Sequence, residues 1–291
     1  VTYIMEITED QSVNKEEIST TIDIQNCDGT EYLKTIDKNS VDLILTDPPY
    51  IISKDSGMNT HYNKVKENAE NNVEFVKTEQ EWLEYKEKNN IENDNKKDNY
   101  MRHGTIYGTK YCVKTDYGDW DSEFTLEKLD EFIGLYYEKL KKGGTLIMFF
   151  DLWKISQLKE IMEKHKFKQI RFIEWIKTNP QPLNSKTNYL TNCREIALLG
   201  VKGGKPTFNS KYDNGIYHYP LQGGKNRFHP TQKSLPLFED IIKKHSNEGD
   251  VVLDTFLGGG TTAFACKKTN RNFKGCDVSK EYYDKVIELL K

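Results

Sequence analysis

The amino-acid sequence predicts an α/β protein with a doubly wound, Rossmann-like sheet of seven strands. Strand-like and helix-like segments alternate along most of the chain, which is the pattern of a mostly parallel sheet covered by helices on both faces. The strand-like segments are short runs of branched apolar residues, as expected for buried strands. One of them passes into a helix through three consecutive glycines, Gly258 to Gly260, a connection that many nucleotide-binding folds use.

The seven strands are expected at residues 21–25, 41–45, 145–150, 169–176, 195–201, 251–254 and 272–276. Helices are expected at residues 126–140, 153–166, 235–244, 261–268 and 280–290. Basic residues followed by glycines predict that the first of these helices stops at Lys141-Lys142-Gly143-Gly144. A turn at Thr178-Asn179-Pro180 separates the fourth strand from the fifth, and residues 202–232 are rich in loop-forming residues.

Residues 56–114 interrupt this alternation. They are dense in Asn, Lys and Glu, and hold one short helix-like run around residues 80–88 and almost no apolar stripe. Composition alone is typical of a solvated insertion. Because the segment leaves the chain just after a strand end, it also suits a lid or an arm that contacts a second copy or a partner subunit. The sequence leaves both interpretations open.

Size and composition allow an enzyme but do not identify its substrate. A chain of 291 residues can bury one large core, and a net charge of −3 does not indicate a nucleic-acid partner. Five cysteines without C-x-x-C spacing argue against a disulfide scaffold or a zinc site and predict a reducing interior with no metal. The absence of a signal-like or membrane-spanning apolar run predicts a soluble cytoplasmic protein.

The first motif with chemical meaning is Asp47-Pro48-Pro49-Tyr50, directly after the buried strand at residues 41–45. Two prolines cannot donate hydrogen bonds to a sheet and hold the residue before them extended. The motif therefore presents a carboxylate, a prolyl carbonyl and an aromatic ring at a strand end. This arrangement suits the binding of a planar amine.

The second motif joins the strand at residues 251–254 to the following helix. Asp254 ends the strand, and the glycines after it allow a ligand to approach the backbone and the helix N-terminus. Asp277 ends the next strand at about the distance where nucleotide-binding folds place a ribose-binding acid. No lysine follows the glycines, so the motif is not a triphosphate-binding loop. A tight turn without a ligand remains the alternative.

Together these motifs resemble those of S-adenosylmethionine-dependent amino-methyltransferases of DNA, in the circularly permuted arrangement where the catalytic motif precedes the cofactor motif. The catalytic signature Asp-Pro-Pro-Tyr is matched in full at residues 47–50. The cofactor signature Asp-Pro-Phe-x-Gly-x-Gly is matched, with Thr255 in place of the proline, at Asp254, Phe256, Gly258 and Gly260. The family's His-Pro-Thr-Gln-Lys recurs at residues 229–233. The resemblance covers the chain outside the insertion and is loosest at residues 179–228.

The resemblance implies S-adenosylmethionine as cofactor. Asp254 and the glycine turn would surround its methionine part, and Thr231, Gln232 and Lys233 would hold its carboxylate. Asp277 would accept hydrogen bonds from both ribose hydroxyls, and Asp28 would lie beside the adenine. The permuted fold also requires that the strand before Asp277 lie next to the strand before Asp28, although the two strands come from opposite ends of the sequence.

The implied reaction is methyl transfer to an exocyclic amine. The Asp47 carboxylate and the Pro48 carbonyl would accept the two amine protons, Pro49 would stiffen the turn, and Tyr50 would stack on a base flipped out of the duplex. An aspartate at position 47 favours adenine N6. The predicted function is site-specific adenine-N6 methylation of double-stranded DNA, as in restriction-modification. An RNA adenine-N6 or a DNA cytosine-N4 methyltransferase, a nicotinamide-dependent oxidoreductase and a non-catalytic binding subunit are the alternatives.

The same resemblance predicts a division of the chain. Residues 1–55 and 115–178 would form the catalytic half, residues 179–228 a target-recognition region, and residues 229–291 the cofactor-binding half. Basic residues lie among aromatic residues around the target-recognition region, as a DNA-binding surface requires, although a basic surface loop has the same composition. The predicted DNA contacts are Lys202, Lys205, Lys211, Tyr212, Lys225 and Arg227.

Overall fold

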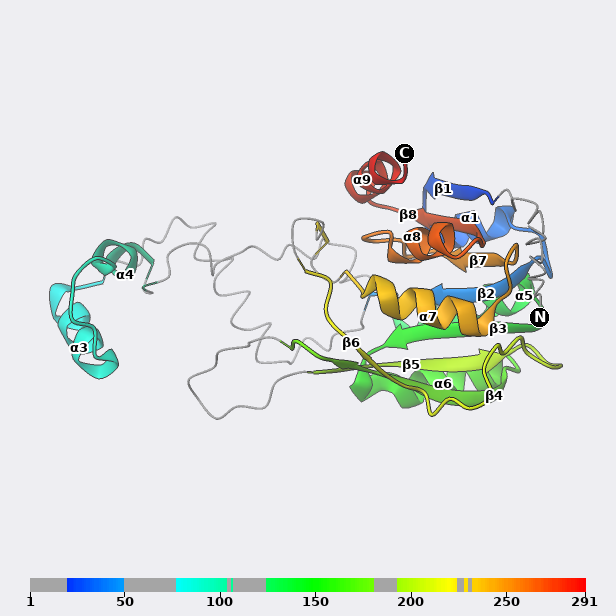
Figure 1. The fold of residues 1–291 in the computed structure, drawn as a ribbon, viewed down its shortest axis with the longest axis horizontal. Helices are drawn as coiled ribbons and strands as arrows, with labels where there is room; N and C mark the ends of the chain where they lie inside the picture. The colour runs from blue at the N-terminus through cyan, green and yellow to red at the C-terminus, as the bar shows by residue number, and fades with distance from the viewer. Residues whose placement is uncertain are drawn as a thin grey trace, which may run out of the picture. The chain divides into compact units, whose positions relative to one another are not determined.

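The computed structural model describes residues 20–49, 77–103, 106, 124–180, 193–223, 228–229 and 232–291 (Figure 1). The chain divides into two compact units, one formed by residues 1–48 with 125–291 and the other by residues 49–124. The second unit contains the insertion expected at residues 56–114. The first unit carries the sheet.

The described residues form one sheet of eight strands. Its strands are β1 (Ile22–Asn26), β2 (Val41–Thr46), β3 (Leu140–Phe150), β4 (Lys168–Lys177), β5 (Arg194–Val201), β6 (Ile216–Tyr219), β7 (Val251–Asp254) and β8 (Asn272–Asp277). Their order across the sheet is β1-β8-β7-β2-β3-β5-β4-β6. The first five strands of this order pair in parallel, β5 is antiparallel to β3 and β4, and β6 is parallel to β4.

The expected seven strands are all present, and β6 corrects the count. It lies in the segment that the sequence predicted to be loop-rich. Strand β6 is only four residues long. It follows a turn that ends at Gly215, which has a φ of 74°. Its pairing partner is the second half of β4, from Glu174 to Lys177. A four-residue strand bordered by Gly and Asn leaves almost no periodic signal in the sequence.

Helices cover both faces of the sheet. Those of the first unit are α1 (Gly29–Thr35), α5 (Leu126–Lys139), α6 (Ile155–Lys164), α7 (Leu235–His245), α8 (Thr261–Lys268) and α9 (Lys280–Leu290), and a short 3-10 turn, Leu152–Lys154, precedes α6. Helices α7 and α8 lie on the near face in Figure 1, whereas α5 and α6 lie behind the strands. None of the described helices is long and apolar enough to cross a membrane.

Alternating side chains of the central strands explain why both faces are apolar. On β2, Leu43 and Leu45 belong to the core cluster that includes the buried residues of α7 and α8, and Ile44 between them is also fully buried. Successive strand residues point to opposite faces, so both faces of β2 are covered. The four described cysteines are free, and Cys266 and Cys276 are buried in the core.

The expected pairing between the two ends of the sequence is confirmed. Strand β1 pairs in parallel with β8, in the register Ile22 with Phe273 to Asn26 with Asp277. The Asn26 side chain donates hydrogen bonds to the carbonyls of Asp277 (2.8 Å) and Val278 (3.1 Å). The pairing places the ends of β1 and β8 side by side at one edge of the sheet.

The helix stop expected at residues 141–144 is wrong. Helix α5 ends at Lys139, and Leu140 to Gly144 already belong to β3. The pairing of β3 with β2 shifts register between Val41 and Leu43, and Gly143 has a φ of 86°. The glycines therefore shape an irregular strand start, as in a β-bulge, rather than a helix end.

The second unit contains α3 (Glu79–Asn89) and α4 (Lys97–His103) in its described part. Helix α3 confirms the helix-like run around residues 80–88. Thr78 and Glu81 form a capping box at its start. Trp82 is buried against the rings of Tyr85 and Tyr100, so three aromatic residues form a small apolar cluster that the polar composition conceals.

Candidate active site

The chemically important residues gather at one edge of the sheet, which we call the C-terminal edge because the parallel strands end there. Parallel strands bring their last residues to the same side, and antiparallel β5 contributes its first residues. The register of β5 with β3, Ile196 opposite Phe150, confirms this placement. The charged residues that follow or end these strands at this edge are Asp28, Asp47, Asp151, Lys177, Glu195, Asp254 and Asp277.

Asp47 and Pro48 follow β2, the central strand of this edge. Pro48 is buried, and Asp47 is half-buried with a side chain 20% exposed. One oxygen of Asp47, Oδ2, lies 2.9 Å from the ammonium of Lys233. Pro49 continues the motif, and Tyr50 lies outside the described residues. The structure thus brings the first motif into contact with the last residue of the His229–Lys233 motif.

The glycine turn between β7 and α8 contacts the same His229–Lys233 segment. Gly258 and Gly260 have φ values of 48° and 72°, in the left-handed region that favours glycine. A Cβ atom at Gly259 would lie 2.9 Å from Gln232 Cγ and 3.1 Å from His229 Cβ. The three glycines are therefore needed both for the turn and for the close approach of the two motifs. Thr231 lies outside the described residues.

Asp254 is buried beneath this turn. Its Oδ1 accepts hydrogen bonds from the Thr46 hydroxyl (2.7 Å) and the Phe256 amide (3.0 Å), and its Oδ2 accepts one from the Thr262 hydroxyl (2.6 Å). Burial raises the pKa of Asp254 to about 6, although these hydrogen bonds act in the opposite direction and Asp47 adds a smaller upward effect. Asp254 therefore joins β2, β7 and α8 beneath the glycine turn. We call this turn, together with the His229–Lys233 segment that packs on it, the cradle.

Asp277 and Asp28 each accept backbone hydrogen bonds. Asp277 accepts from the Gly258 amide (2.7 Å) and the Ser279 amide (2.8 Å), and burial raises its pKa. Asp28 caps helix α1 by accepting from the Thr30 amide (2.8 Å). Burial alone would raise the pKa of Asp28, but hydrogen bonds from Thr30 and Glu31 outweigh it and lower the pKa.

Two residues that sequence reasoning missed complete the site. Glu195 at the start of β5 lies 2.5 Å from Lys233 Nζ through Oε2 and 2.7 Å from Lys177 Nζ through Oε1. With Asp47 they form an alternating series, Lys177–Glu195–Lys233–Asp47, which we call the four-charge row. The available signal was a charged residue at the last position of β4, Lys177, and one near the start of β5, Glu195. Spacing in the sequence could not show that the two charges meet.

The row lies in a largely buried environment. The side chains of Lys233 and Glu195 are 8% and 18% exposed, and Lys233 Nζ also lies 5.4 Å from the centre of the Phe149 ring. Burial alone would raise the pKa of Glu195, but the charges of Lys233 and Lys177 outweigh it and hold the pKa below its usual value. Glu195 therefore remains a carboxylate between two ammonium groups.

The structure places four of the residues predicted to contact DNA at the edge of the sheet opposite Asp47. Val201 at the end of β5 pairs with Thr145, five residues before the end of β3, so the chain leaves β5 on the side of the sheet away from Asp47. The Lys202 ammonium donates to Asn39 Oδ1 and the Leu140 carbonyl, both at 2.7 Å. The other three predicted contacts, Lys205, Lys211 and Tyr212, follow Lys202 in the same segment.

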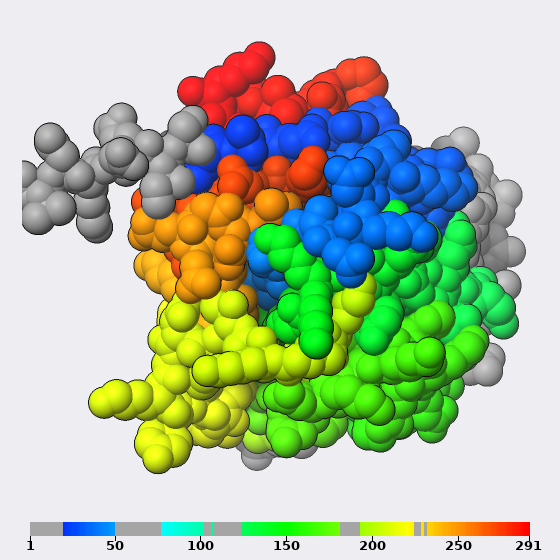
Figure 2. All heavy atoms as spheres, turned by 90° about the vertical axis from the view of Figure 1, so that its right-hand side faces the viewer, coloured from blue at the N-terminus to red at the C-terminus, as the bar shows by residue number. Residues whose placement is uncertain are grey.

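Two further contacts hold this segment at the opposite edge. The Asn209 side chain donates to the Ser246 carbonyl (2.8 Å), next to the end of α7, and Gly143 packs against the backbone of Lys205. Figure 2 looks onto the opposite edge, and the yellow residues near 200–220 cross it. After β6 the chain returns to the C-terminal edge, where the Leu221 amide donates to Asn179 Oδ1 (2.6 Å). Lys225 and Arg227 lie outside the described residues.

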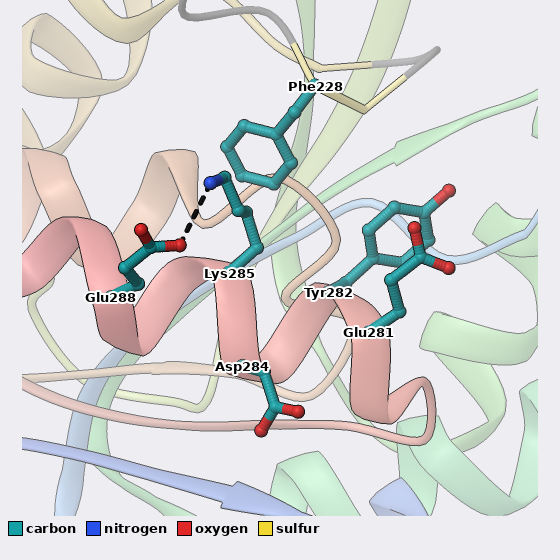
Figure 3. Close-up of a pocket in the computed structure, with 6 residues that line it drawn as sticks. All are labelled: Phe228, Glu281, Tyr282, Asp284, Lys285 and Glu288. Carbon is teal, nitrogen blue, oxygen red and sulfur yellow. Dashed lines mark hydrogen bonds and ion pairs between the residues drawn. The ribbon is translucent and has the colours of Figure 1, made fainter.

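A surface cavity of about 420 Å³ lies between Phe228 and helix α9 (Figure 3). Phe228 and the side chains of α9 line it, and its Tyr282 packs edge-on against His229 with ring centres 4.4 Å apart. Figure 3 shows Lys285 and Glu288 paired below Phe228, whereas Asp284 points away from them. Three of its four charged residues are acidic, so the cavity does not suit a phosphate. No group of three potential metal ligands occurs in the described residues.

Comparisons with known proteins agree with this site. A family model described as DNA methylase, for N6 and N4 methyltransferases, matches residues 41–288. Type II methyltransferase M2.DpnII of Streptococcus pneumoniae is 35% identical over 195 residues, which cover 58% of this chain and 70% of that protein. Type II methyltransferase M.HpaI of Haemophilus parainfluenzae is 29% identical over 89% of this chain and 70% of its own length.

Solved structures give the same result for the fold. The M1.HpyAVI–SAM complex superposes with a TM-score of 0.60 at 26% identity, covering 93% of this chain and all of that chain. The cytosine-N4-specific PvuII DNA methyltransferase has a TM-score of 0.59 at 14% identity, covering 90% and 84% of the two chains. At that identity the second likeness concerns the fold alone.

Proposed function

Because the chain belongs to the family of N6 and N4 DNA methylases, we propose that it methylates adenine N6 at a specific short site in double-stranded DNA. It is an S-adenosylmethionine-dependent DNA methyltransferase, and membership of the family leaves the choice between adenine N6 and cytosine N4 to the site. The observation that carries the proposal is the contact of Asp47 with the cofactor-side residue Lys233 at the C-terminal edge. The contact joins the catalytic motif to the cofactor cradle.

The described cradle fits S-adenosylmethionine. The turn from Gly258 to Gly260 carries no side chains of its own, and its tight bend depends on the positive φ of Gly258 and Gly260. Asp277 lies beside this turn at the end of β8, where each of its oxygens accepts one backbone hydrogen bond and retains a further lone pair for a ribose hydroxyl. We propose that Gln232, Phe256, Gly258, Gly260 and Asp277 line the cofactor site, with Thr231 beside them. Lys233, which was also predicted to hold the cofactor carboxylate, pairs with Asp47 and Glu195 in this structure. The cofactor supplies an electrophilic methyl group.

Asp254 and Asp28 contribute to this site through the backbone. The oxygens of Asp254 accept hydrogen bonds from Thr46, Thr262 and Phe256. Asp254 therefore shapes the cradle from below, and its negative charge still favours the cofactor ammonium above it. Asp28 holds the start of α1 next to the end of β1, at the same edge as Asp277.

Asp47 and Pro48 act on the target amine. An exocyclic amine is a weak nucleophile because its lone pair is delocalised into the base. The Asp47 carboxylate and the Pro48 carbonyl accept hydrogen bonds from its two protons, which localises the lone pair on nitrogen and directs it at the methyl carbon. When bound, S-adenosylmethionine would supply the methyl group to this nitrogen, and its sulfur would retain the electron pair of the C–S bond that is broken. One amine proton then leaves through Asp47 to solvent.

The substrate base must leave the helix to reach this pocket. Asp47 and Pro48 lie directly after the central strand, in a half-buried position that a stacked base cannot reach. We propose that the base is flipped out and that Tyr50 stacks on it. The target-recognition region was predicted at residues 179–228. We propose that the part after β6, residues 220–228, recognises DNA, and that Lys225 and Arg227 contact phosphates. The 49–124 unit is a candidate surface for a second copy or a partner subunit.

The test is a methylation assay with labelled S-adenosylmethionine on duplex DNA, single-stranded DNA and RNA, followed by nucleoside analysis. Label in N6-methyladenine from duplex DNA is the expected result. Asp47→Ala should lower the single-turnover rate by roughly 100-fold or more while cofactor affinity changes little. The control is Asp37→Ala, an exposed aspartate between α1 and β2. Label in N4-methylcytosine or in RNA would overturn the proposed substrate, and a fully active Asp47→Ala would overturn the role of Asp47.

A further inference from the structure

The buried four-charge row gives Glu195 a function at the catalytic motif. Lys233 Nζ lies between two carboxylates, 2.9 Å from Asp47 Oδ2 and 2.5 Å from Glu195 Oε2. From this geometry we infer that Glu195 is a positioning residue, which holds Lys233 against one oxygen of Asp47 and so aims the other oxygen at the target amine. This inference rests on the proposed function, because it concerns the same carboxylate and the same amine.

The orientation of Asp47 matters because the reaction depends on direction. A carboxylate that rotates freely can offer either oxygen to the amine, and a displacement of about 1 Å in an aligned group can slow a reaction by roughly 100-fold. The two prolines fix the backbone after Asp47 but leave its side-chain torsions unconstrained. The ammonium of Lys233 is the charged group that engages Oδ2. It can fix the carboxylate only if its own position is fixed.

Glu195 fixes Lys233 because Glu195 is itself anchored on both sides. Its backbone belongs to β5, which pairs with β4 on one side and β3 on the other. Its Oε1 lies 2.7 Å from Lys177 Nζ, whose side chain is only 11% exposed. Lys233, in contrast, lies in a segment between β6 and α7, outside the sheet. The rigid sheet thus positions the mobile end of the lysine.

The alternating signs explain how the row tolerates burial. Two lysines and two acids sum to zero net charge, and adjacent members are opposite in sign. A single buried charge would be strongly destabilising, whereas a paired one is compensated by its neighbours. Loss of Glu195 alone would remove the carboxylate that pairs with both Lys177 and Lys233. Lys233 would then shift, and Asp47 with it.

Glu195→Gln is the direct test, because it keeps the shape of the side chain and removes its charge. The single-turnover methylation rate should fall roughly 10- to 100-fold, while the Kd values for S-adenosylmethionine and for duplex DNA stay within about threefold. The matched control is Glu174→Gln on the neighbouring strand, whose partner Arg194 is 65% exposed at 3.4 Å. This control should retain the wild-type rate. An unchanged rate in Glu195→Gln would overturn the inference.

A double-mutant cycle separates positioning from a merely structural role. If Glu195 acts through Lys233, then Glu195→Gln should slow Lys233→Met little further, because the ammonium that transmits the effect is already gone. If the rate reductions of the two single variants multiply in the double variant, the inference is overturned. If Glu195→Gln lowers the melting temperature severely, the charge-balanced Lys177→Gln/Glu195→Gln variant, assayed below its own transition, should show the same slow transfer. If this double variant is folded and methylates at the wild-type rate, the inference about Glu195 is wrong.

The outcome for the wild-type protein keeps the two proposals distinct. Wild-type protein that transfers no methyl group to DNA would contradict the proposed function. Wild-type protein that methylates DNA together with a Glu195→Gln variant that is equally fast would contradict only the role of Glu195.

Discussion

At the scale of single residues, the sequence motifs identify the reactive groups but not their partners. Asp47, Gly258 and Asp277 could be named because each belongs to a pattern that runs along the chain. Glu195 could not be named from the sequence. Its partner Lys233 lies 38 positions away, and the contact depends on how β5 faces the segment just before α7. Thr255 is similar. Its hydroxyl shares a buried hydrogen bond with Tyr136, which supplies a partner for the threonine that replaces the usual proline.

Asp254 should make the stability of the protein depend on pH in an unusual direction. Its folded-state pKa of about 6 lies above the ordinary 3.8, so the folded protein keeps this proton while the unfolded chain loses it. The stabilisation is complete below pH 3.8 and is lost as the pH rises to about 6. At 1.36 kcal/mol per unit, the difference amounts to roughly 3 kcal/mol by pH 7.

Comparison with Asp254→Asn isolates this effect from all other titrating groups. Relative to wild type, the variant should gain roughly 3 kcal/mol of unfolding free energy between pH 4 and pH 7. Urea unfolding without cofactor, followed at several pH values in that interval, measures the difference. A difference that stays constant across the interval would show that Asp254 does not retain its proton in the folded state.

At the scale of helices and strands, apolar patterns predicted most elements of the first unit but missed α1 and β6. Each expected strand and each expected helix of the first unit is present, because their buried faces repeat at the period of their backbone. The seven-residue α1 and the four-residue β6 were not predicted. Both are short, and β6 lacks the apolar run that marks the equally short β7. Their positions depend on the Asp28 cap and on pairing with β4.

The packing of the glycine turn against the His229–Lys233 segment gives a prediction at this scale. In Gly259→Ala, the new methyl group would lie 2.9 Å from Gln232 Cγ and must push that segment away from the cradle. Overpacking of this kind costs about 1–3 kcal/mol, so the affinity for S-adenosylmethionine should fall on the order of tenfold or more. Isothermal titration calorimetry measures it.

The control for this substitution is Gly223→Ala, because a Cβ there would meet no atom within 4 Å. It should bind the cofactor like wild type. Equal affinities in Gly259→Ala and Gly223→Ala would mean that the contact between the turn and Gln232 does not shape the cofactor site.

At the scale of the whole molecule, topology decides which charges can meet DNA. The fold class and the pairing of β1 with β8 followed from the order of the motifs. The position of the basic segment did not, because composition cannot show that antiparallel β5 releases the chain at the opposite edge. Two basic clusters that are neighbours in the sequence, Lys205 with Lys211 and Lys225 with Arg227, are therefore expected to differ in function.

Salt dependence distinguishes the two clusters. Each phosphate contact adds about 0.9 to the slope of log affinity against log salt concentration. Lys225→Gln/Arg227→Gln should lower the slope for duplex DNA by about 1.8, and Lys205→Gln/Lys211→Gln should leave it unchanged. Fluorescence anisotropy over a salt series measures both. A reduced slope in the second variant would place DNA at the opposite edge and contradict the orientation proposed here.

The pairing of β1 with β8 also has a consequence for protein synthesis. Residues that hydrogen-bond between these strands lie 251 positions apart, so β1 leaves the ribosome long before its partner exists. During that interval β1 has no strand beside it, and Asp277, which we propose lines the cofactor site, has not been translated. Non-local pairing of this kind folds slowly and late. A nascent chain therefore acquires its catalytic motif early but becomes able to bind the methyl donor only near the end of translation.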